Sequence, residues 1–318
     1  MTPSWENPRM RFIVRVAVPA LAGALLPLHA AAQAPPAPPA AITVPDDPLR
    51  QAFERRLEAT ALALDGDMGY CIVDLTTGAR LSRKGDQAFP TASTIKIAVL
   101  YELFRQADEK RLRLDDVRAL GAATRVEGSG ILQFLDTPAL SLTDYATLMI
   151  MLSDNSATNV LIDAVGMDNV NQRMRSLGLA HIWLQRRMID LEAAKQGREN
   201  LASPCDLAAL LGIVEKGTGL TTASREAMLA ILRKPKSTPI TRAVPAGIPV
   251  ASKPGGLDGV AVDAGFVALP GRPYIVVGMT TWLSTGSDGD AAVEVLARDT
   301  HAYFARLARG GRYGRMIP

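Results

Sequence analysis

The chain has 318 residues, of which 48% are hydrophobic and 21% charged, and its formal net charge at pH 7 is +3. This composition excludes wholesale disorder, and the length allows one large domain or two subdomains that share a core. Residues 1–34 carry three Arg against one Glu, so the rest of the chain is close to +1 and we expect no nucleic-acid partner.

The N-terminal segment is similar to an export signal. Residues 1–34 place Arg9, Arg11 and Arg15 ahead of an apolar run over 16–26, and they end in the small-residue sequence HAAAQA. The apolar run is too short for a permanent membrane helix. We therefore expect cleavage, a periplasmic or secreted mature protein, and no membrane contact afterwards, with retention of the segment as an anchor as the alternative.

The first predicted elements follow a linker. Residues 35–45, PPAPPAAITVP, are rich in Pro and Ala and predict an extended tether ahead of the folded part. An amphipathic helix is predicted over 47–64, because apolar residues recur there at helical spacing. The β-prone run at 68–75, the break TTGA and a short return around Leu81 together predict a hairpin.

The middle of the chain is mostly helical in its pattern. A strong helix is predicted over 93–106, and further helices over 142–152, 156–165 and 205–216. Capping serines precede the first and the last of these three, and glycine follows the second and the last.

Strand character returns late in the chain. Three β-prone runs at 248–252, 260–269 and 274–281 are separated by Gly and Pro and predict a meander, and 290–309 predicts a final helix. This order of elements predicts an α+β protein with three α-β-α layers, in which terminal helices cover an antiparallel sheet and an all-helical subdomain lies beside it.

These elements place one folded domain at residues 46–310. We expect its sheet subdomain at about 46–92 and 240–310, and its helical subdomain at about 93–239. The chain contains no internal repeat and no glycine signature of a dinucleotide or phosphate site, and we expect a monomer.

Histidine and cysteine are scarce. Beyond the signal only His181 and His301 remain, which is too few for a His-based triad or a multi-histidine metal site, so we expect no metal and no cofactor. A serine nucleophile here needs another base, and lysine serves when burial and neighbouring charges lower its pKa. The spacing of Cys71 and Cys205 establishes no disulfide, and two buried free thiols are the simpler alternative.

Three short motifs can carry chemistry. Ser-x-x-Lys occurs once, at Ser93 and Lys96, where the spacing puts both side chains on one face of a helix start. A helix N-terminus favours an alkoxide and offers a backbone N–H to an oxyanion. Alone, the motif is better explained by a capping serine followed by a snorkelling lysine. The chain also has Ser-Asp-Asn at 153–155, between two predicted helices, and Lys-Pro-Gly at 253–255.

In this order the three motifs resemble the signature of class A β-lactamases and penicillin-binding proteins, over about residues 47–309. The resemblance implies a β-lactamase/transpeptidase-like fold and a serine hydrolase acylated at Ser93. It implies hydrolysis of the β-lactam amide of penicillins and cephalosporins through an acyl-enzyme. The partner is then a small-molecule β-lactam or a peptidoglycan-like substrate.

The resemblance also implies a role for each residue. Ser93 attacks the carbonyl, Lys96 accepts its proton, and Ser153 relays a proton to the leaving nitrogen. The other residues bind the substrate. They are Asn155 for a substrate amide, Lys253 for the substrate carboxylate with Gly255 beside it, and Gly256, whose N–H holds the oxyanion together with that of Ser93.

The chain departs from the family in a loop after the second motif. Met188 falls where class A enzymes carry the glutamate that activates the deacylating water, and methionine cannot activate water. Glu192 follows four residues later, within reach on a helix, so we expect it to be the deacylation base. Asp190 is a weaker candidate, and a solvated loop carboxylate is the plain alternative. We also expect Arg186 to pin the loop by pairing with Glu199.

The third motif departs as well. Pro254 stands where most relatives have Thr or Ser, and it removes both a hydroxyl and a backbone donor, which suits only an edge or irregular strand position. We expect weaker carboxylate recognition, with Arg242 as a candidate second cation or as a solvated side chain.

Two alternative functions remain. One is a slow-deacylating D-alanyl-D-alanine peptidase, acyltransferase or esterase on the same fold, and the other is a catalytically silent β-lactam or cell-wall binder.

Overall fold

The computed structural model describes residues 47–136, 138–311 and 314–316. The expected signal peptide at 1–34 and linker at 35–45 lie outside the described residues. Within the part of the chain that is described, no helix combines the length and the apolar character needed to cross a membrane.

A five-stranded antiparallel sheet forms the centre of the fold, with the strand order β2-β1-β9-β8-β7. Its strands are β1 (Asp67–Asp74), β2 (Arg80–Arg83), β7 (Val250–Leu257), β8 (Val260–Val267) and β9 (Tyr274–Thr281). The predicted hairpin and meander are confirmed. The strand β7 continues past Pro254, and it lies at an edge of the sheet, as a residue without a backbone N–H requires.

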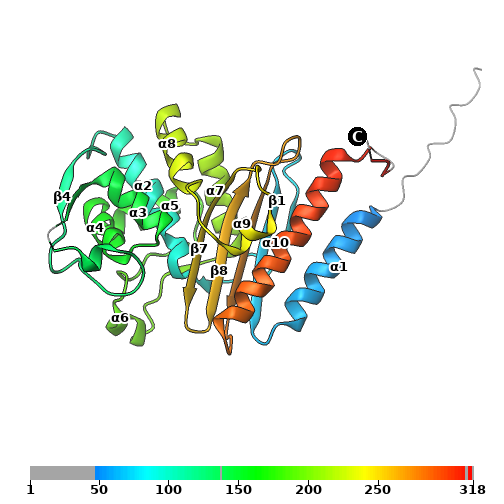
Figure 1. Ribbon diagram of the computed structural model, residues 1–318, viewed down its shortest axis with the longest axis horizontal. Helices are drawn as coiled ribbons and strands as arrows, with labels where there is room; N and C mark the ends of the chain where they lie inside the picture. Colours follow the sequence, from blue (N-terminus) through cyan, green and yellow to red (C-terminus); the bar gives the residue numbers. More distant parts are fainter. Residues whose placement is uncertain (1–46, 137, 312–313, 317–318) are drawn as a thin grey trace, which may run out of the picture. The chain divides into compact units, whose positions relative to one another are not determined.

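Two terminal helices cover one face of this sheet (Figure 1). They are α1 (Pro48–Ala63) and α10 (Gly286–Arg309), and the short helix α9 (Pro239–Ala243) packs beside α10. Asp47 caps α1 by accepting a hydrogen bond from the backbone N–H of Arg50, which explains why the helix begins where it does. The apolar faces of the helices and the sheet form one core cluster.

The other face of the sheet carries the helix α7 (Pro204–Lys216) and then the helical part of the fold. α7 falls within the segment 93–239, yet it packs directly on β1, β8 and β9. The remaining elements are η1 (Ala92–Ile95), α2 (Lys96–Asp108), η2 (Leu132–Phe134), α3 (Leu142–Met151), α4 (Asn155–Val165), α5 (Met167–Ser176), α6 (Leu191–Lys195) and α8 (Thr222–Leu232), with the short strands β3 (Phe89–Pro90), β4 (Val117–Ala119), β5 (Ala139–Ser141) and β6 (Leu201–Ala202).

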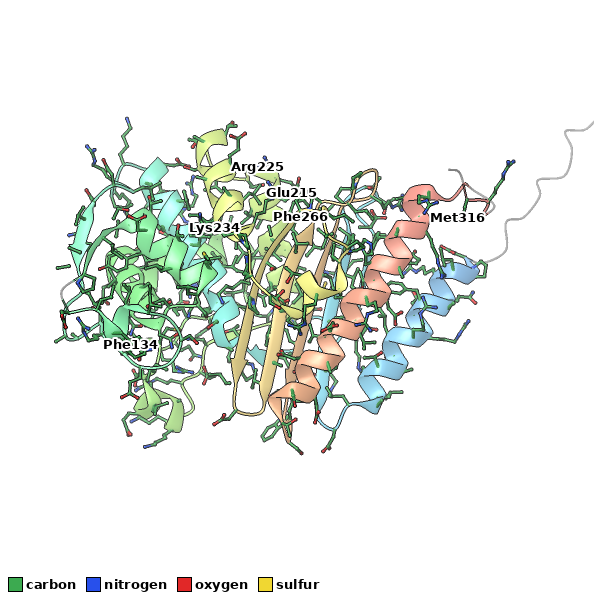
Figure 2. The ribbon with its side chains drawn as sticks, viewed as in Figure 1. Phe134, Glu215, Arg225, Lys234, Phe266 and Met316 are labelled. Carbon is green, nitrogen blue, oxygen red and sulfur yellow. The ribbon has the colours of Figure 1, made fainter. Side chains whose placement is uncertain are left out.

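Buried apolar side chains hold this helical part together. α2 runs through its middle and contacts α3, α4, α5, α7 and α8, and most of its side chains are buried. At the surface the ion pair between Arg225 of α8 and Glu215 of α7 joins neighbouring helices at 3.6 Å (Figure 2). The α+β class is therefore confirmed, with helices on both faces of an antiparallel sheet.

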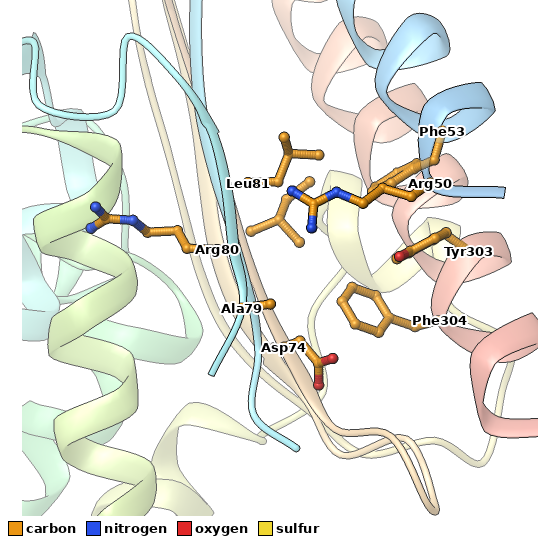
Figure 3. Close-up of a pocket in the computed structure, with 9 residues that line it drawn as sticks. Arg50, Phe53, Asp74, Ala79, Arg80, Leu81, Tyr303 and Phe304 are labelled. Carbon is orange, nitrogen blue, oxygen red and sulfur yellow. The ribbon is translucent and has the colours of Figure 1, made fainter. Parts of the chain in front are cut away.

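A small cavity lies between the terminal helices and the β1–β2 hairpin (Figure 3). Its volume is about 40 Å³, which is room for ordered water and too little for a substrate. Phe53 and Tyr303 line it, and their rings stack with centroids 4.3 Å apart. This stacking fixes α1 on α10.

Phe53 therefore tests how the terminal helices stabilise the fold. Its side chain is 1% exposed, so Phe53→Ala should lower the free energy of unfolding by about 3–5 kcal/mol. The matched control is Leu62→Ala in the same helix, where the side chain is 69% exposed and the change should stay within about 0.5 kcal/mol. Urea unfolding followed by circular dichroism measures both, and equal losses would show that α1 does not pack through Phe53.

Candidate active site

The hydroxyl of Ser153 is the point where the predicted catalytic side chains meet. It donates a hydrogen bond to the Oγ of Ser93 at 2.8 Å. It accepts hydrogen bonds from the Nζ of Lys96 at 3.1 Å and from the Nζ of Lys253 at 3.0 Å. Three segments far apart in the sequence thus converge on one oxygen atom.

Ser93 lies in the tight turn η1 rather than inside an α-helix, which begins only at Lys96. Ala92 before it has φ +45°, a conformation that is unusual for a residue with a side chain and that is often found at functional sites. The turn is anchored at Thr91, whose N–H and hydroxyl both donate to the carbonyl of Asn200, at 2.9 and 3.0 Å. These contacts fix the direction in which Ser93 points.

Ser153 lies in the turn between α3 and α4, with φ +54°. Asp154 holds this turn, because its carboxylate caps α4 at the N–H of Ala157 and also accepts from the N–H groups of Ile131 and Leu132, at 2.8, 2.7 and 2.9 Å. The position of Asp154 directly before a helix is the signal in the sequence for such a cap.

Lys96 is fully buried and binds only neutral oxygen atoms. Its Nζ donates to the carbonyl oxygen of Ser153 at 2.7 Å and to the Oδ1 of Asn155 at 3.0 Å, besides the Ser153 hydroxyl. Burial and the nearby charge of Lys253 lower the pKa of Lys96 well below its usual value, although Asp154 opposes this. A neutral amine at this position can accept a proton.

Lys253 on β7 is also fully buried. Its Nζ donates to the carbonyl of Pro254 at 2.8 Å and to the hydroxyl of Ser153. Burial lowers the pKa of Lys253 to about 7, while Asp263 raises it and Lys236 lowers it further. The amine therefore changes charge near neutral pH, in contact with the same hydroxyl that Lys96 binds.

Gly255 brings the edge strand β7 against η1, the turn that carries Ser93. A Cβ atom at this position would lie 2.6 Å from the backbone N of Ser93 and 2.9 Å from the carbonyl oxygen of Thr91. Only glycine allows so close an approach of two backbones. Gly256 has open space, with no atom nearer than 3.8 Å to such a Cβ.

The loop before α6 is held as expected at one end. The guanidinium of Arg186 binds both carboxylate oxygens of Glu199, each at 3.0 Å, which confirms this predicted pair. The backbone of Met188 exchanges two hydrogen bonds with the side chain of Asn159, at 2.9 and 3.2 Å, and the Met188 side chain is 7% exposed. An apolar side chain therefore packs at the position where class A enzymes carry a glutamate.

Glu192 lies apart from this network. Its carboxylate pairs with the Nζ of Lys195 at 2.8 Å, and the two side chains are 75% and 71% exposed. Among the described residues, no hydrogen bond or ion pair joins Glu192 to the cluster around Ser153. Asp190 caps α6 by accepting from the N–H of Ala193 at 3.0 Å.

Arg242 does not offer a free charge to a substrate carboxylate. Its Nε donates to Glu294 of α10 at 2.8 Å, so the ion pair joins α9 to the terminal helix. Within the described part of the chain, no group of three or more His, Cys, Asp or Glu could hold a metal ion. The side chains that meet around Ser153 offer hydroxyl, amine and amide groups.

Comparisons with known proteins identify the family of the chain. A family model described as the β-lactamase enzyme family matches residues 51–304. Beta-lactamase AST-1 of Nocardia asteroides is 30% identical over 229 residues, which cover 70% of this chain and 73% of that protein.

Solved structures show the same relationship. The β-lactamase of Sphaerobacter thermophilus is 35% identical, with a TM-score of 0.72 over 78% of this chain and 95% of that chain. The structure of PBP-A is 28% identical, with a TM-score of 0.75 over 80% of this chain and 96% of that chain. The chain belongs to the β-lactamase enzyme family and is a class A β-lactamase-like serine hydrolase.

Proposed function

We propose that this protein hydrolyses the β-lactam amide of penicillins and cephalosporins through an acyl-enzyme on Ser93. The observation that carries the proposal is the Ser153 hydroxyl, which contacts the Oγ of Ser93 and the Nζ atoms of two buried lysines. Support also comes from its relatives, several of which are named β-lactamases. A mutant of PBP-A has been solved as an acyl-enzyme complex with penicillin G.

Acylation begins with removal of the Ser93 proton. Because a hydroxyl can rotate, Ser153 can accept this proton while it passes its own to the neutral amine of Lys96. The freed Oγ attacks the lactam carbonyl. The N–H groups of Ser93 and Gly256 then stabilise the oxyanion, and the close approach of β7 to the nucleophile turn at Gly255 supports this pairing.

The second half of acylation breaks the lactam C–N bond. Ser153 donates its proton to the leaving nitrogen and recovers one from a lysine that already hydrogen-bonds it. In its charged form Lys253 attracts the substrate carboxylate, and the amide of Asn155 binds the acyl side chain while its Oδ1 holds Lys96.

In this proposal Glu192 is the base that activates water for deacylation. The carboxylate has to leave Lys195 to do so, since the two groups now form an exposed ion pair. Substitution of either partner leaves the buried cluster around Ser153 untouched. The step can therefore be tested separately from acylation.

A second candidate is a penicillin-binding D-alanyl-D-alanine peptidase or related enzyme that deacylates slowly. The observation that favours it is the burial of Met188, together with the solvent position of Glu192. The similarity to PBP-A supports it as well. Both candidates share the acylation chemistry at Ser93 and differ in how fast the acyl group leaves.

We further propose that the enzyme acts as an exported monomer, after removal of residues 1–34. Support comes from the basic, apolar and small residues of that segment. The catalytic domain then comprises residues 46–310, with the sheet and helical subdomains as expected above.

One time course tests the main proposal. A chromogenic cephalosporin reports turnover and a fluorescent penicillin reports covalent labelling. The wild type should turn over many equivalents with transient labelling, Ser93→Ala should lose both, and Ser237→Ala, an exposed serine outside the network, should match the wild type. Durable labelling without turnover would support the slow-deacylating candidate, and a wild type without labelling would contradict both.

The charge of Lys253 predicts a pH dependence. Lys253 is cationic below its pKa of about 7 and neutral above it, so carboxylate binding is present below pH 7 and is lost as the pH rises. For an anionic penicillin, kcat/KM should fall above pH 7 by up to about tenfold per pH unit. The methyl ester of the same penicillin lacks the charge and should show no such decline. An identical decline for both compounds would mean that Lys253 does not recognise the carboxylate.

The deacylation base is tested by three variants. Glu192→Gln should keep the acylation rate but slow loss of the acyl group by about 10²–10⁴-fold, as expected for removal of a general base. Lys195→Gln is the matched control and should not slow this step. Met188→Glu should accelerate deacylation if the second candidate is correct. Intact-mass spectrometry after a penicillin pulse measures all three, and unchanged deacylation in Glu192→Gln would exclude Glu192 as the base.

A further inference from the structure

A second cluster of reactive side chains lies away from the active site, where α7 begins on the sheet. Cys71 of β1 is fully buried and Cys205 of α7 is 5% exposed, and both are free thiols. We propose that these two thiols form a modification site, which oxidises to a disulfide by exchange with a disulfide-containing reagent or oxidoreductase. This proposal does not depend on the substrate of Ser93.

Packing around the two residues brings their sulfur atoms together. Pro204, at the start of α7, packs on β1, because a Cβ at Gly69 would lie 3.1 Å from its Cγ. Gly69 and Cys71 are two residues apart on one strand, so they face the same side of the sheet. Cys205 is the residue after Pro204, so it lies over Cys71 on the same face of the sheet.

The neighbouring β2 hairpin confirms this placement from the other side. Cys71 is paired in register with Ser82. A Cβ at Gly85 would lie 2.7 Å from the Sγ of Cys205 and 2.9 Å from the Oγ of Ser82. The side chains of Cys205 and Ser82 therefore lie close to each other beside Gly85. The N–H of Cys205 also donates to the carbonyl of Gly85 at 2.9 Å. The two thiols are close enough for each to shift the pKa of the other.

The two sulfurs have different chemical roles. The neighbouring thiol of Cys71 lowers the pKa of Cys205, burial opposes this, and Ser82 lowers it further. The same contact and burial raise the pKa of Cys71. Cys205 is therefore the thiolate that attacks first, and its cover is thin because Gly85 has no side chain and Ser82 is exposed.

The exchange is balanced in two steps. The Cys205 thiolate attacks one sulfur of a reagent R–S–S–R, forms a mixed disulfide and releases one thiolate R–S⁻, which takes up a proton. Cys205 then no longer carries a charge, so Cys71 can lose its proton and attack the Cys205 sulfur, releasing the second R–S⁻. Two electrons and two protons pass from the cysteines to the reagent, which leaves as two R–SH.

The crosslink would enclose residues 72–204, which include Ser93 and Ser153. It would join β1 to the start of α7, which follows directly after β6, and β6 pairs with β3 just before Ser93. Closure of so long a loop restricts the unfolded chain, so the oxidised protein should melt on the order of 5–10 °C higher than the reduced one. Activity at 25 °C should change little, because neither cysteine contacts the Ser153 network.

The full chain, purified under reducing conditions, is incubated in its folded state with oxidised glutathione and then alkylated. Mass spectrometry should show the loss of two protons and one peptide pair joined through Cys71 and Cys205. Thermal unfolding should show the higher Tm only for this form. Cys205→Ser should take up no glutathione, whereas Cys71→Ser should keep a stable mixed disulfide at Cys205.

The matched control is the double variant Cys71→Ser/Cys205→Ser, whose Tm should be the same with and without oxidised glutathione. Two alkylated thiols in the folded wild type after prolonged incubation would overturn the proposal. So would a wild type that stops at the mixed disulfide. A crosslinked form with an unchanged Tm would overturn its stabilising role.

Discussion

The candidate active site depends on the hydroxyl group of Ser153, which binds two buried lysines and the hydroxyl of Ser93. Neither Lys96 nor Lys253 hydrogen-bonds a carboxylate, and the Nζ atoms of both bind neutral oxygen atoms. Burial is the main cause that lowers the pKa of both lysines, and the nearby charge of Lys253 lowers the pKa of Lys96 further. A carboxylate inside this cluster would restore the charge and remove the basicity.

Two turns with positive φ, and the hydrogen bonds that anchor them, hold this arrangement in place. Ala92 and Ser153 both adopt positive φ, and Asp154 and Asn200 fix the segments on which they lie. Unusual backbone conformations therefore occur at Ser153 and directly before Ser93, a kind of strain that is often found at functional sites. Rigid support on every side allows the hydroxyls to stay within hydrogen-bonding distance.

Much of the fold could be predicted from the sequence, because the spacing of apolar and turn residues indicates local secondary structure. The terminal helices, the hairpin, the meander and the edge position of Pro254 followed from periodicity, turn residues and the missing N–H of proline. The position of Glu192 could not be predicted, because spacing along a helix indicates only which face of the helix a residue occupies and not where its side chain points. Its carboxylate turns to Lys195 in solvent. The contact between Met188 and Asn159 joins residues 29 apart, and no local pattern reports such a pairing.

The close approach of β7 to the turn at Ser93 has a consequence for folding. The hydrogen bonds that unite the cluster span 60 residues between the two serines and 100 residues between Ser153 and Lys253. Contacts of such sequence separation form slowly, since long loops must close first. A nascent chain that still lacks β7 has neither Lys253 nor the strand that packs against the turn at Ser93. The cluster is therefore completed late in synthesis, when the last strands of the sheet dock.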